Sequence, residues 1–220
     1  MFALAFAAFS AHAQVPPNPA EVAQFGPLHA AAHRGDLPRL GAALAAGAAP
    51  NGRESYGRTA LHIATFARQR DTIRQLAQAG ADLDALENDR YDAVTIAAVA
   101  DDEETLALLL SLGASAKLTT SRYDGTALIA AAHLGHDGVV RQLIAAGAPL
   151  DHVNNLHWTA VIEAIVLGDG GPRHQACLRA LVDAGANLQL ADRSGRTPLQ
   201  LARERGYAEM ERILLAAPKR

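Results

Sequence analysis

A Gly-Ala pair recurs along the chain at intervals of 33, 33, 34 and 38 residues, and this period limits the possible folds more than any other feature. A period of this length is typical of arrays in which each unit is one supersecondary motif stacked on its neighbours. Six units extend from about residue 22 to the C-terminus. The pairs that end the first five units are Gly47-Ala48, Gly80-Ala81, Gly113-Ala114, Gly147-Ala148 and Gly185-Ala186.

Each unit is predicted to hold two short helices. In four units a threonine precedes the first helix, where its hydroxyl can cap the free backbone amides. Alanine pairs in the first helix allow close stacking, and apolar pairs such as Leu108-Leu109, Leu143-Ile144 and Leu181-Val182 fill a second layer. The glycine of each Gly-Ala pair is predicted to end the second helix in the left-handed conformation. Helices this short are unstable alone, so the units depend on one another.

These blocks resemble the ankyrin repeat, whose signature is a T-P-L-H-x-A block, a G-H turn and a terminal Gly-Ala-Asp. The matching stretches include PLHAAAHRGD from Pro27, TALHIATFARQ from Thr59, TALIAAAHLGH from Thr126 and TPLQLARERGY from Thr197. The departures are local: Gly26 and Asp92 replace the threonine, Asp101-Asp102 replaces Gly-His, and the fifth unit carries Ile162, Glu163 and a five-residue extension.

The resemblance implies an all-α solenoid of about six helix–turn–helix repeats with short hairpin fingers, including the stretches 51–57 and 121–125. It also implies a concave face, formed by the fingers and the first helices, that binds another protein. The expected unit boundaries lie approximately at 22–55, 56–89, 90–122, 123–156, 157–194 and 195–220.

The first 13 residues are predicted to be a secretory signal peptide. Residues 1–9 form a short apolar run, and Ala11-His12-Ala13 is a small-x-small site before Gln14. The run is too short to span a bilayer, which requires ~20 apolar residues; no lysine or arginine precedes it. We therefore expect cleavage after Ala13, an extended arm over residues 14–21, and a periplasmic or secreted protein.

The composition excludes several other classes of protein. Half of the residues are hydrophobic and the net charge is −3, which argues against disorder and against nucleic acid as the main partner. The single cysteine, Cys177, allows neither an internal disulfide nor a cysteine-cluster zinc site, and is predicted to be buried. No later segment resembles a transmembrane helix, and no nucleophile elbow or phosphate-binding loop is present. We expect a protein that is not an enzyme, has no cofactor and is monomeric on its own.

Nine histidines raise the alternative of a metal-binding or catalytic protein. His29 and His62 fall in the T-P-L-H block and His136 in the G-H turn, so the resemblance implies structural hydrogen bonds for them. His133 and His157 are predicted on the concave face, where a histidine metal site across repeats could form. No H-x-x-x-H pair with a nearby carboxylate supports it.

The acidic run 101–104 could form a carboxylate site or the start of a helix. Acidic residues suit the positive end of a helix, so this run is predicted to begin the second helix of the third unit. Asp101 stands where other units have glycine and is expected to adopt the left-handed conformation.

The expected partner-binding residues lie at the finger tips and on the first helices. Three of the four tyrosines and the only tryptophan are predicted at tips, and Tyr, Trp and Arg dominate binding hot spots. The alternative is that these aromatic side chains pack on the neighbouring finger. Because the tips carry more arginine than acid, a partner with some negative charge is expected. The predicted set is Arg53, Tyr56, Arg58, Phe66, Asp89, Tyr91, Arg122, Tyr123, His133, Asn155, His157, Trp158, Arg193 and Arg196.

The extension at 168–174 replaces a tight turn with a longer loop. It is either a tolerated insertion or a second recognition element that carries Asp169, Arg173 and His174. The overall expectation is a non-enzymatic interaction module of the bacterial envelope that regulates or protects an exported enzyme. The alternatives are a metal-binding or catalytic protein that uses the concave histidines, and a module that binds a cell-wall polymer.

Overall fold

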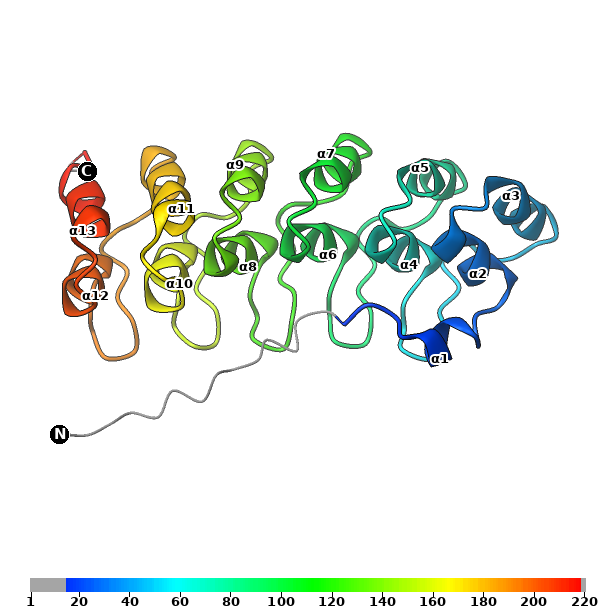
Figure 1. The fold of residues 1–220 in the computed structure, drawn as a ribbon, viewed down its shortest axis with the longest axis horizontal. Helices are drawn as coiled ribbons and strands as arrows, with labels where there is room; N and C mark the ends of the chain where they lie inside the picture. The colour runs from blue at the N-terminus through cyan, green and yellow to red at the C-terminus, as the bar shows by residue number, and fades with distance from the viewer. Residues whose placement is uncertain (1–14, 219–220) are drawn as a thin grey trace.

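The computed structural model describes residues 15–218, which form thirteen helices (Figure 1). A single-turn helix comes first, and six helix pairs follow, one pair within each predicted unit. The helices are α1 (Pro19–Val22), α2 (Pro27–Arg34), α3 (Leu37–Ala45), α4 (Ala60–Phe66), α5 (Arg70–Gln78), α6 (Ala93–Val99), α7 (Glu103–Ser111), α8 (Ala127–Leu134), α9 (Asp137–Ala145), α10 (Ala160–Val166), α11 (Pro172–Asp183), α12 (Pro198–Glu204) and α13 (Ala208–Leu215).

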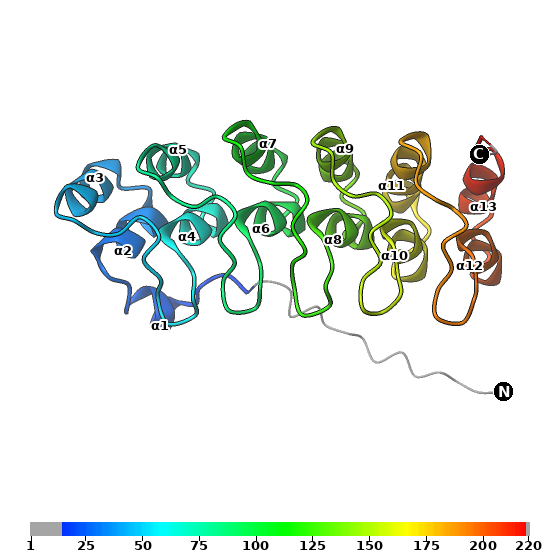
Figure 2. The same ribbon diagram turned by 180° about the vertical axis from the view of Figure 1, so that it is seen from behind.

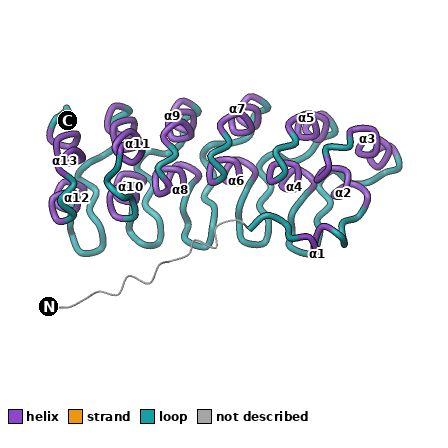
Figure 3. The backbone as a smooth tube through the Cα atoms, viewed as in Figure 1, coloured by secondary structure: helices purple, strands orange, loops and turns teal. Residues whose placement is uncertain are grey.

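The pairs stack side by side into an elongated array with two helical layers. The first helices, α2 to α12 by even numbers, form one row, and the second helices, α3 to α13 by odd numbers, form the other (Figure 1). The loops between units project beyond the first row as hairpin fingers (Figure 3). Residues 15–218 contain no strand, only isolated bridges at Arg53–Thr59 and Thr120–Gly125. The predicted all-α solenoid of about six repeats is confirmed.

The core lies between the two layers and between neighbouring units. The second-layer residues Leu109, Leu143 and Leu181 are completely buried, as the helical spacing predicted. Burying one leucine contributes about 1.5–3 kcal/mol, and each unit adds only a few such residues. The stability of the array therefore depends on the contacts between units. Among residues 15–218, no helix has the length and apolar character needed to cross a bilayer.

The predicted helix ends are present. All five glycines of the Gly-Ala pairs have φ between 79° and 101°, which ends each second helix in the left-handed region. Asp101 takes the same conformation with φ 51°, as expected for a residue that replaces glycine. Asp92, which replaces the usual threonine, caps α6 by accepting a 2.9 Å hydrogen bond from the amide of Thr95.

The N-terminal arm differs from the prediction. Pro19–Val22 form helix α1 instead of continuing an extended segment, because the side chain of Asn18 accepts hydrogen bonds from the first amides of the turn. Proline at the first helical position also favours the turn. The predicted signal peptide, residues 1–13, lies outside the described residues.

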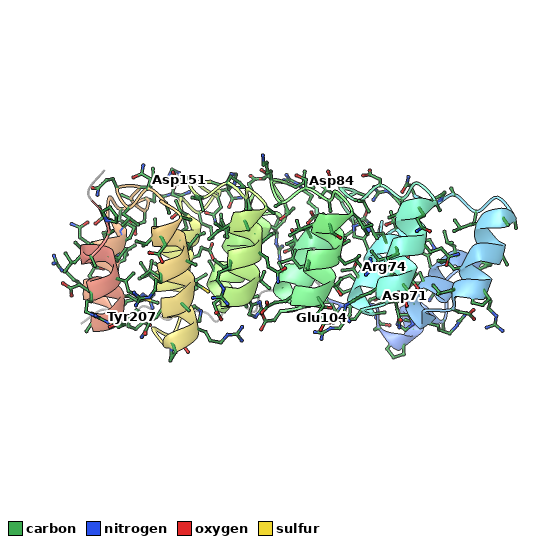
Figure 4. All side chains as sticks on the ribbon, turned by 90° about the horizontal axis from the view of Figure 1, so that it is seen from above. Asp71, Arg74, Asp84, Glu104, Asp151 and Tyr207 are labelled. Atoms are coloured by element: carbon green, nitrogen blue, oxygen red, sulfur yellow. The ribbon has the colours of Figure 1, made fainter. Side chains whose placement is uncertain are left out.

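A row of hydrogen bonds joins the loops that follow the second helices. In three junctions, a side-chain oxygen of one unit accepts from a backbone amide of the next unit. Two of these acceptors, Asp84 and Asp151, lie along one edge of the array in Figure 4. The bonds run from the amides of Asp82, Ser115 and Asn187 to Asn51, Asp84 and Asp151, at 2.7–2.8 Å.

The junction between the third and fourth units lacks this bond for a covalent reason. The residue in the donor position is Pro149, which has no backbone N–H. The residue in the acceptor position is Lys117, whose side chain cannot accept a hydrogen bond. Donor and acceptor are therefore absent together, and no polar group is left unpaired by the change.

This difference supplies a matched pair of variants. Asp84→Ala removes a bond between units and is expected to lower the free energy of unfolding by about 0.5–1.5 kcal/mol. Lys117→Ala, at the equivalent position without a bond, is expected to change it by less than about 0.5 kcal/mol. Urea unfolding followed by circular dichroism measures both. If the two substitutions changed the free energy of unfolding equally, the hydrogen bond of Asp84 would not be what stabilises the junction.

Candidate partner-binding face

Five fingers connect the six units, at residues 54–58, 87–91, 121–125, 154–158 and 192–196. We call the surface formed by these fingers and the adjoining side of the first helices the finger face. Figure 2 shows the fingers from behind as a row of similar loops. The short helix α1 lies at the level of the first finger (Figure 1).

Each finger is closed by the same two local features. The side chain of its first residue accepts hydrogen bonds from the finger's own backbone, as when Glu54 accepts from the amides of Tyr56 and Arg58 at 2.9 and 3.0 Å. Its fourth residue lies in the left-handed region, with φ between 52° and 76°. The five acceptors are Glu54, Glu87, Ser121, Asn154 and Asp192; the left-handed residues are Gly57, Arg90, Asp124, His157 and Gly195.

We did not predict this closing pattern, although the sequence contains its signal. A polar residue stands five positions before the residue that caps the next first helix, in every finger. Short polar side chains that bond to nearby backbone amides are typical of turns.

The left-handed position gives a direct prediction for His157. Its φ of 64° is unfavourable for a residue with a Cβ atom, so His157→Gly is expected to leave stability unchanged or raise it by up to about 1 kcal/mol. Gly195→Ala tests the reverse change at the same position of the fifth finger, where an added Cβ would meet no atom within 4 Å. It is expected to cost about 1 kcal/mol, again measured by urea unfolding. A large decrease in the free energy of unfolding of His157→Gly would mean that contacts of the imidazole stabilise the finger.

Hydrogen bonds also join each finger to the next one. The amide of Asn88 donates to the carbonyl of Tyr56 at 3.2 Å, and the amide of Asn155 donates to that of Tyr123 at 3.0 Å. The amide of Ser121 binds the carbonyl of Arg90 in the same way, at 3.0 Å. The fingers are therefore fixed relative to one another before any partner arrives, which reduces the ordering cost of binding.

The predicted binding residues differ in accessibility. Eight are exposed: Arg53, Tyr56, Asp89, Arg122, Asn155, His157, Arg193 and Arg196. Five are half-buried: Phe66, Tyr91, Tyr123, His133 and Trp158. Trp158 packs partly against the core, whereas Tyr56 keeps 49% of its surface exposed. The tip aromatic residues thus combine packing on the array with partial exposure.

Arg58 was wrongly placed on the binding surface. It is only 4% exposed, and its guanidinium forms ion pairs with Glu54 at 3.0 Å and with Glu21 of α1. Burial alone would raise the pKa of the Glu54 carboxyl, but the hydrogen bonds from Arg58 hold it below its usual value. Arg58 therefore anchors α1 to the first finger and is not available to a partner.

The other tip arginines are largely engaged within the array. The guanidinium of Arg53 donates to the carbonyl of Leu86, just before the second finger, at 2.6 Å, and Arg193 donates to the carbonyl of Asn155 at 2.9 Å. Arg196 pairs with Asp192 and Glu204. The tips therefore present less positive charge to a partner than the number of their arginines suggested. Arg122 is exposed, and its guanidinium lies 5.6 Å from the centre of the Tyr123 ring.

The concave histidines do not converge. His133 of α8 turns toward Glu163 of α10, with 3.3 Å between Nδ1 and Oε2. Glu163 is 4% exposed, and its other oxygen accepts a 2.9 Å hydrogen bond from Asn154. His157 stands apart at the turn of the fourth finger. Within residues 15–218, no three His, Cys, Asp or Glu side chains gather closely enough to hold a metal ion.

Both the sequence and the fold match those of known proteins. The family model "Ankyrin repeats (3 copies)" matches residues 9–87 and 94–188. The chain is 35% identical to the ankyrin repeat protein YahD of Escherichia coli (strain K12) over 188 residues, which are 85% of this chain and 93% of that protein. The chain belongs to the ankyrin repeat family. An ankyrin repeat domain is a protein–protein interaction module, and such proteins are generally non-enzymatic.

Solved ankyrin repeat structures agree with this one over most of their length. An ankyrin repeat domain from Acinetobacter baumannii AYE matches with a TM-score of 0.82 and 44% identity, covering 87% of this chain and 97% of that one. The ankyrin repeat domain of Bcl-3, a member of the IkappaB protein family, matches with a TM-score of 0.79 and 25% identity, covering 90% and 88%.

The T-P-L-H and G-H histidines of these ankyrin repeats have the expected structural roles. His62 bonds the hydroxyl and amide of Thr59 through Nδ1 and the carbonyl of Tyr91 through Nε2. His29 reaches the carbonyl of Arg58, and His136 that of Ala98. Cys177 is fully buried, which raises the pKa of its thiol to about 12 and suppresses reactivity at neutral pH.

The extension of the fifth ankyrin repeat holds the array together. Nε2 of His174 lies 2.9 Å from the carbonyl of His133 in the preceding repeat, and Nδ1 lies 2.8 Å from Asp169. Arg173 pairs with Asp137 of the fourth repeat and, at 2.7 Å, with Asp101 of the third. These contacts occupy all three residues proposed as a second recognition element. The extension therefore helps to join the repeats, while the side chains of Asp169 and Arg173 remain exposed.

Proposed function

We propose that this ankyrin repeat chain binds one partner protein through its finger face, in the envelope of a bacterium, and thereby regulates or protects an exported enzyme. The observation that carries the proposal is the locked row of fingers, on which Tyr56, Tyr123 and Trp158 remain at least partly exposed. Rigid aromatic side chains on a preorganised surface are favourable binding elements. The chain acts by binding and has no catalytic step of its own.

The location rests on the predicted signal peptide and has its own test. Residues 1–25 are fused to an alkaline phosphatase that lacks its leader and is active only after export. The fusion is expected to be active in intact cells, and a fusion that begins at residue 15 is expected to be inactive. Equal activity of both fusions would contradict export through this segment.

The binding face is tested by affinity capture from an envelope extract. The bait is the chain from Gln14 onward, compared with the variant Tyr123→Ala plus Trp158→Ala. A back-face control carries Asp71→Ala plus Arg74→Ala, two exposed residues of α5 in the second-helix layer (Figure 4). One stoichiometric partner is expected with wild type and the control, and at least tenfold less with the finger-face variant.

A second finger-face variant distinguishes loss of the binding surface from loss of folding. Trp158 packs partly against the core, so melting of its variant is measured alongside capture. Leu156→Glu changes a side chain that is exposed at the tip of the fourth finger and is also expected to reduce capture. A partner that both folded variants retain would show that the finger face is not the binding surface.

A further inference from the structure

A pocket of about 250 Å³ opens on the finger face near its N-terminal end. It lies between the first two fingers, the end of α4 and the arm before α1. Its walls carry three aromatic side chains, three carboxylates and one guanidinium, which is a chemistry unlike that of the apolar core. The lining residues are Val15, Glu21, Tyr56, Arg58, Phe66, Glu87, Asp89 and Tyr91.

The aromatic side chains come from three different elements. Tyr56 belongs to the first finger, Tyr91 to the second, and Phe66 is the last residue of α4. The guanidinium of Arg58 lies 4.6 Å from the centre of the Tyr56 ring, so this ring already contacts one cation. The faces of aromatic rings attract cations through their quadrupole, most strongly where water is excluded.

The charges of the pocket do not balance. The single guanidinium, Arg58, is already paired with Glu21 and with Glu54 next to the pocket. Within residues 15–218, neither Glu87 nor Asp89 has an ion-pair partner, and Glu87 accepts a 3.0 Å hydrogen bond from the amide of Tyr91. Three lining carboxylates against one guanidinium leave a net charge of −2.

Burial and the nearby negative charges both disfavour the charged forms of groups in this pocket. Desolvation raises the pKa of Glu87 above its usual value. Burial raises the pKa of the Tyr91 phenol, and the nearby charges of Asp89 and Glu87 raise it further. A cation placed between the rings would relieve this uncompensated charge.

We infer that the pocket binds the side chain of a lysine or arginine in an extended segment of the partner protein. The volume admits one long side chain and no folded element. The carboxylates are too dispersed for a compact metal site, because no group of three metal-ligating side chains occurs in the described part of the chain. An ammonium or guanidinium on a flexible stem can reach both the rings and the carboxylates. This inference rests on the proposed function and specifies a basic partner segment.

The test uses small probes on the intact chain from Gln14 onward. Nα-acetyl-lysine amide, Nα-acetyl-arginine amide and the neutral isostere Nα-acetyl-norleucine amide are titrated and followed by amide chemical shifts in NMR. The two cations are expected to bind with dissociation constants of about 1–10 mM, and norleucine at least tenfold more weakly. The shifts should centre on Tyr56, Phe66, Glu87 and Tyr91.

Matched variants separate the pocket from general attraction. Glu87→Gln plus Asp89→Asn removes two charges at the pocket and is expected to weaken cation binding at least tenfold, while the substituted amide side chain can still accept from the finger backbone. Asp71→Asn plus Asp183→Asn removes two exposed charges from the second helices and should change binding less than twofold. Equal loss in both variants, or equal binding of norleucine, would overturn the inference.

A further variant leaves the aromatic and charged side chains of the pocket in place. Val15→Lys places a competing ammonium at the rim and should weaken the probes several-fold, whereas Val15→Met should not. The inference and the proposed function can fail separately. If the probes do not bind, but wild type captures a partner that the Tyr123 and Trp158 variant does not, only the pocket is rejected. Probes that bind, with no partner captured, reject only the wider finger-face function.

Discussion

Arg58→Met is expected to lower the free energy of unfolding by about 3–5 kcal/mol. The substitution leaves the half-buried carboxylates of Glu21 and Glu54 without their cation, and a carboxylate held away from water without a partner is costly. A loss of this size is a large part of the 5–15 kcal/mol that stabilises an ordinary domain. Urea unfolding measures it, and helix α1 should become accessible to proteases first, because Glu21 attaches it to the array.

Arg196→Met is the matched control, because Arg196 has the same position in the fifth finger. Its side chain is 45% exposed, and it pairs with Asp192 and Glu204. Water can replace much of that pairing, so we expect a loss below about 1 kcal/mol. Adding Glu21→Gln and Glu54→Gln to Arg58→Met should restore part of the stability. Comparable losses in Arg58→Met and Arg196→Met would reject a special role for the buried pair.

The protonation of His62 alone is expected to lower the free energy of unfolding by about 3 kcal/mol as the pH falls from 6.5 to 4. Burial lowers the pKa of His62 from 6.5 to about 4 in the folded chain. The unfolded chain therefore takes up a proton first, so acid favours unfolding across this interval. Burial also lowers the pKa of His29, which adds to the loss in the same direction. Urea unfolding at half-unit steps of pH gives the slope.

His62→Gln should reduce that slope and leave the protein folded at pH 7. The sixth repeat shows why glutamine fits: the side-chain oxygen of Gln200 accepts from the amide of Thr197 at 2.8 Å, as Nδ1 of His62 does at Thr59. Glutamine has no proton to gain between pH 6.5 and 4. An unchanged slope in this variant would assign the acid sensitivity to other groups.

The repeat fold was predictable because its signals are local. The glycines that end the second helices, the residues that cap the first ones and the buried leucines of the second layer each act within one repeat. Contacts between repeats were not predictable in the same way. Arg58 stands at a finger tip in the sequence, yet its guanidinium turns inward to Glu21, 37 residues away. Position along the chain does not determine where a long side chain points.

The finger face was predicted in outline and corrected in detail. The aromatic tip residues are at least partly exposed, whereas Arg58 is buried and Arg53 and Arg193 bind backbone carbonyls at neighbouring fingers. The pocket beside Glu87 depends on side chains from the arm, two fingers and two helices, α1 and α4. Such a site forms only after stacking, so the sequence of any single repeat contains no sign of it.

The bridge from Arg173 to Asp101 has a consequence for how the array unfolds. A solenoid with contacts only between adjacent repeats loses its repeats singly from the ends. Arg173 belongs to the fifth repeat and Asp101 to the third, with the fourth repeat between them contributing Asp137. Fraying of the fifth repeat therefore also removes a support of the third, which makes the central repeats open more nearly as one cooperative block. Because the ion pair is accessible to solvent, added salt should loosen this block and restore stepwise fraying.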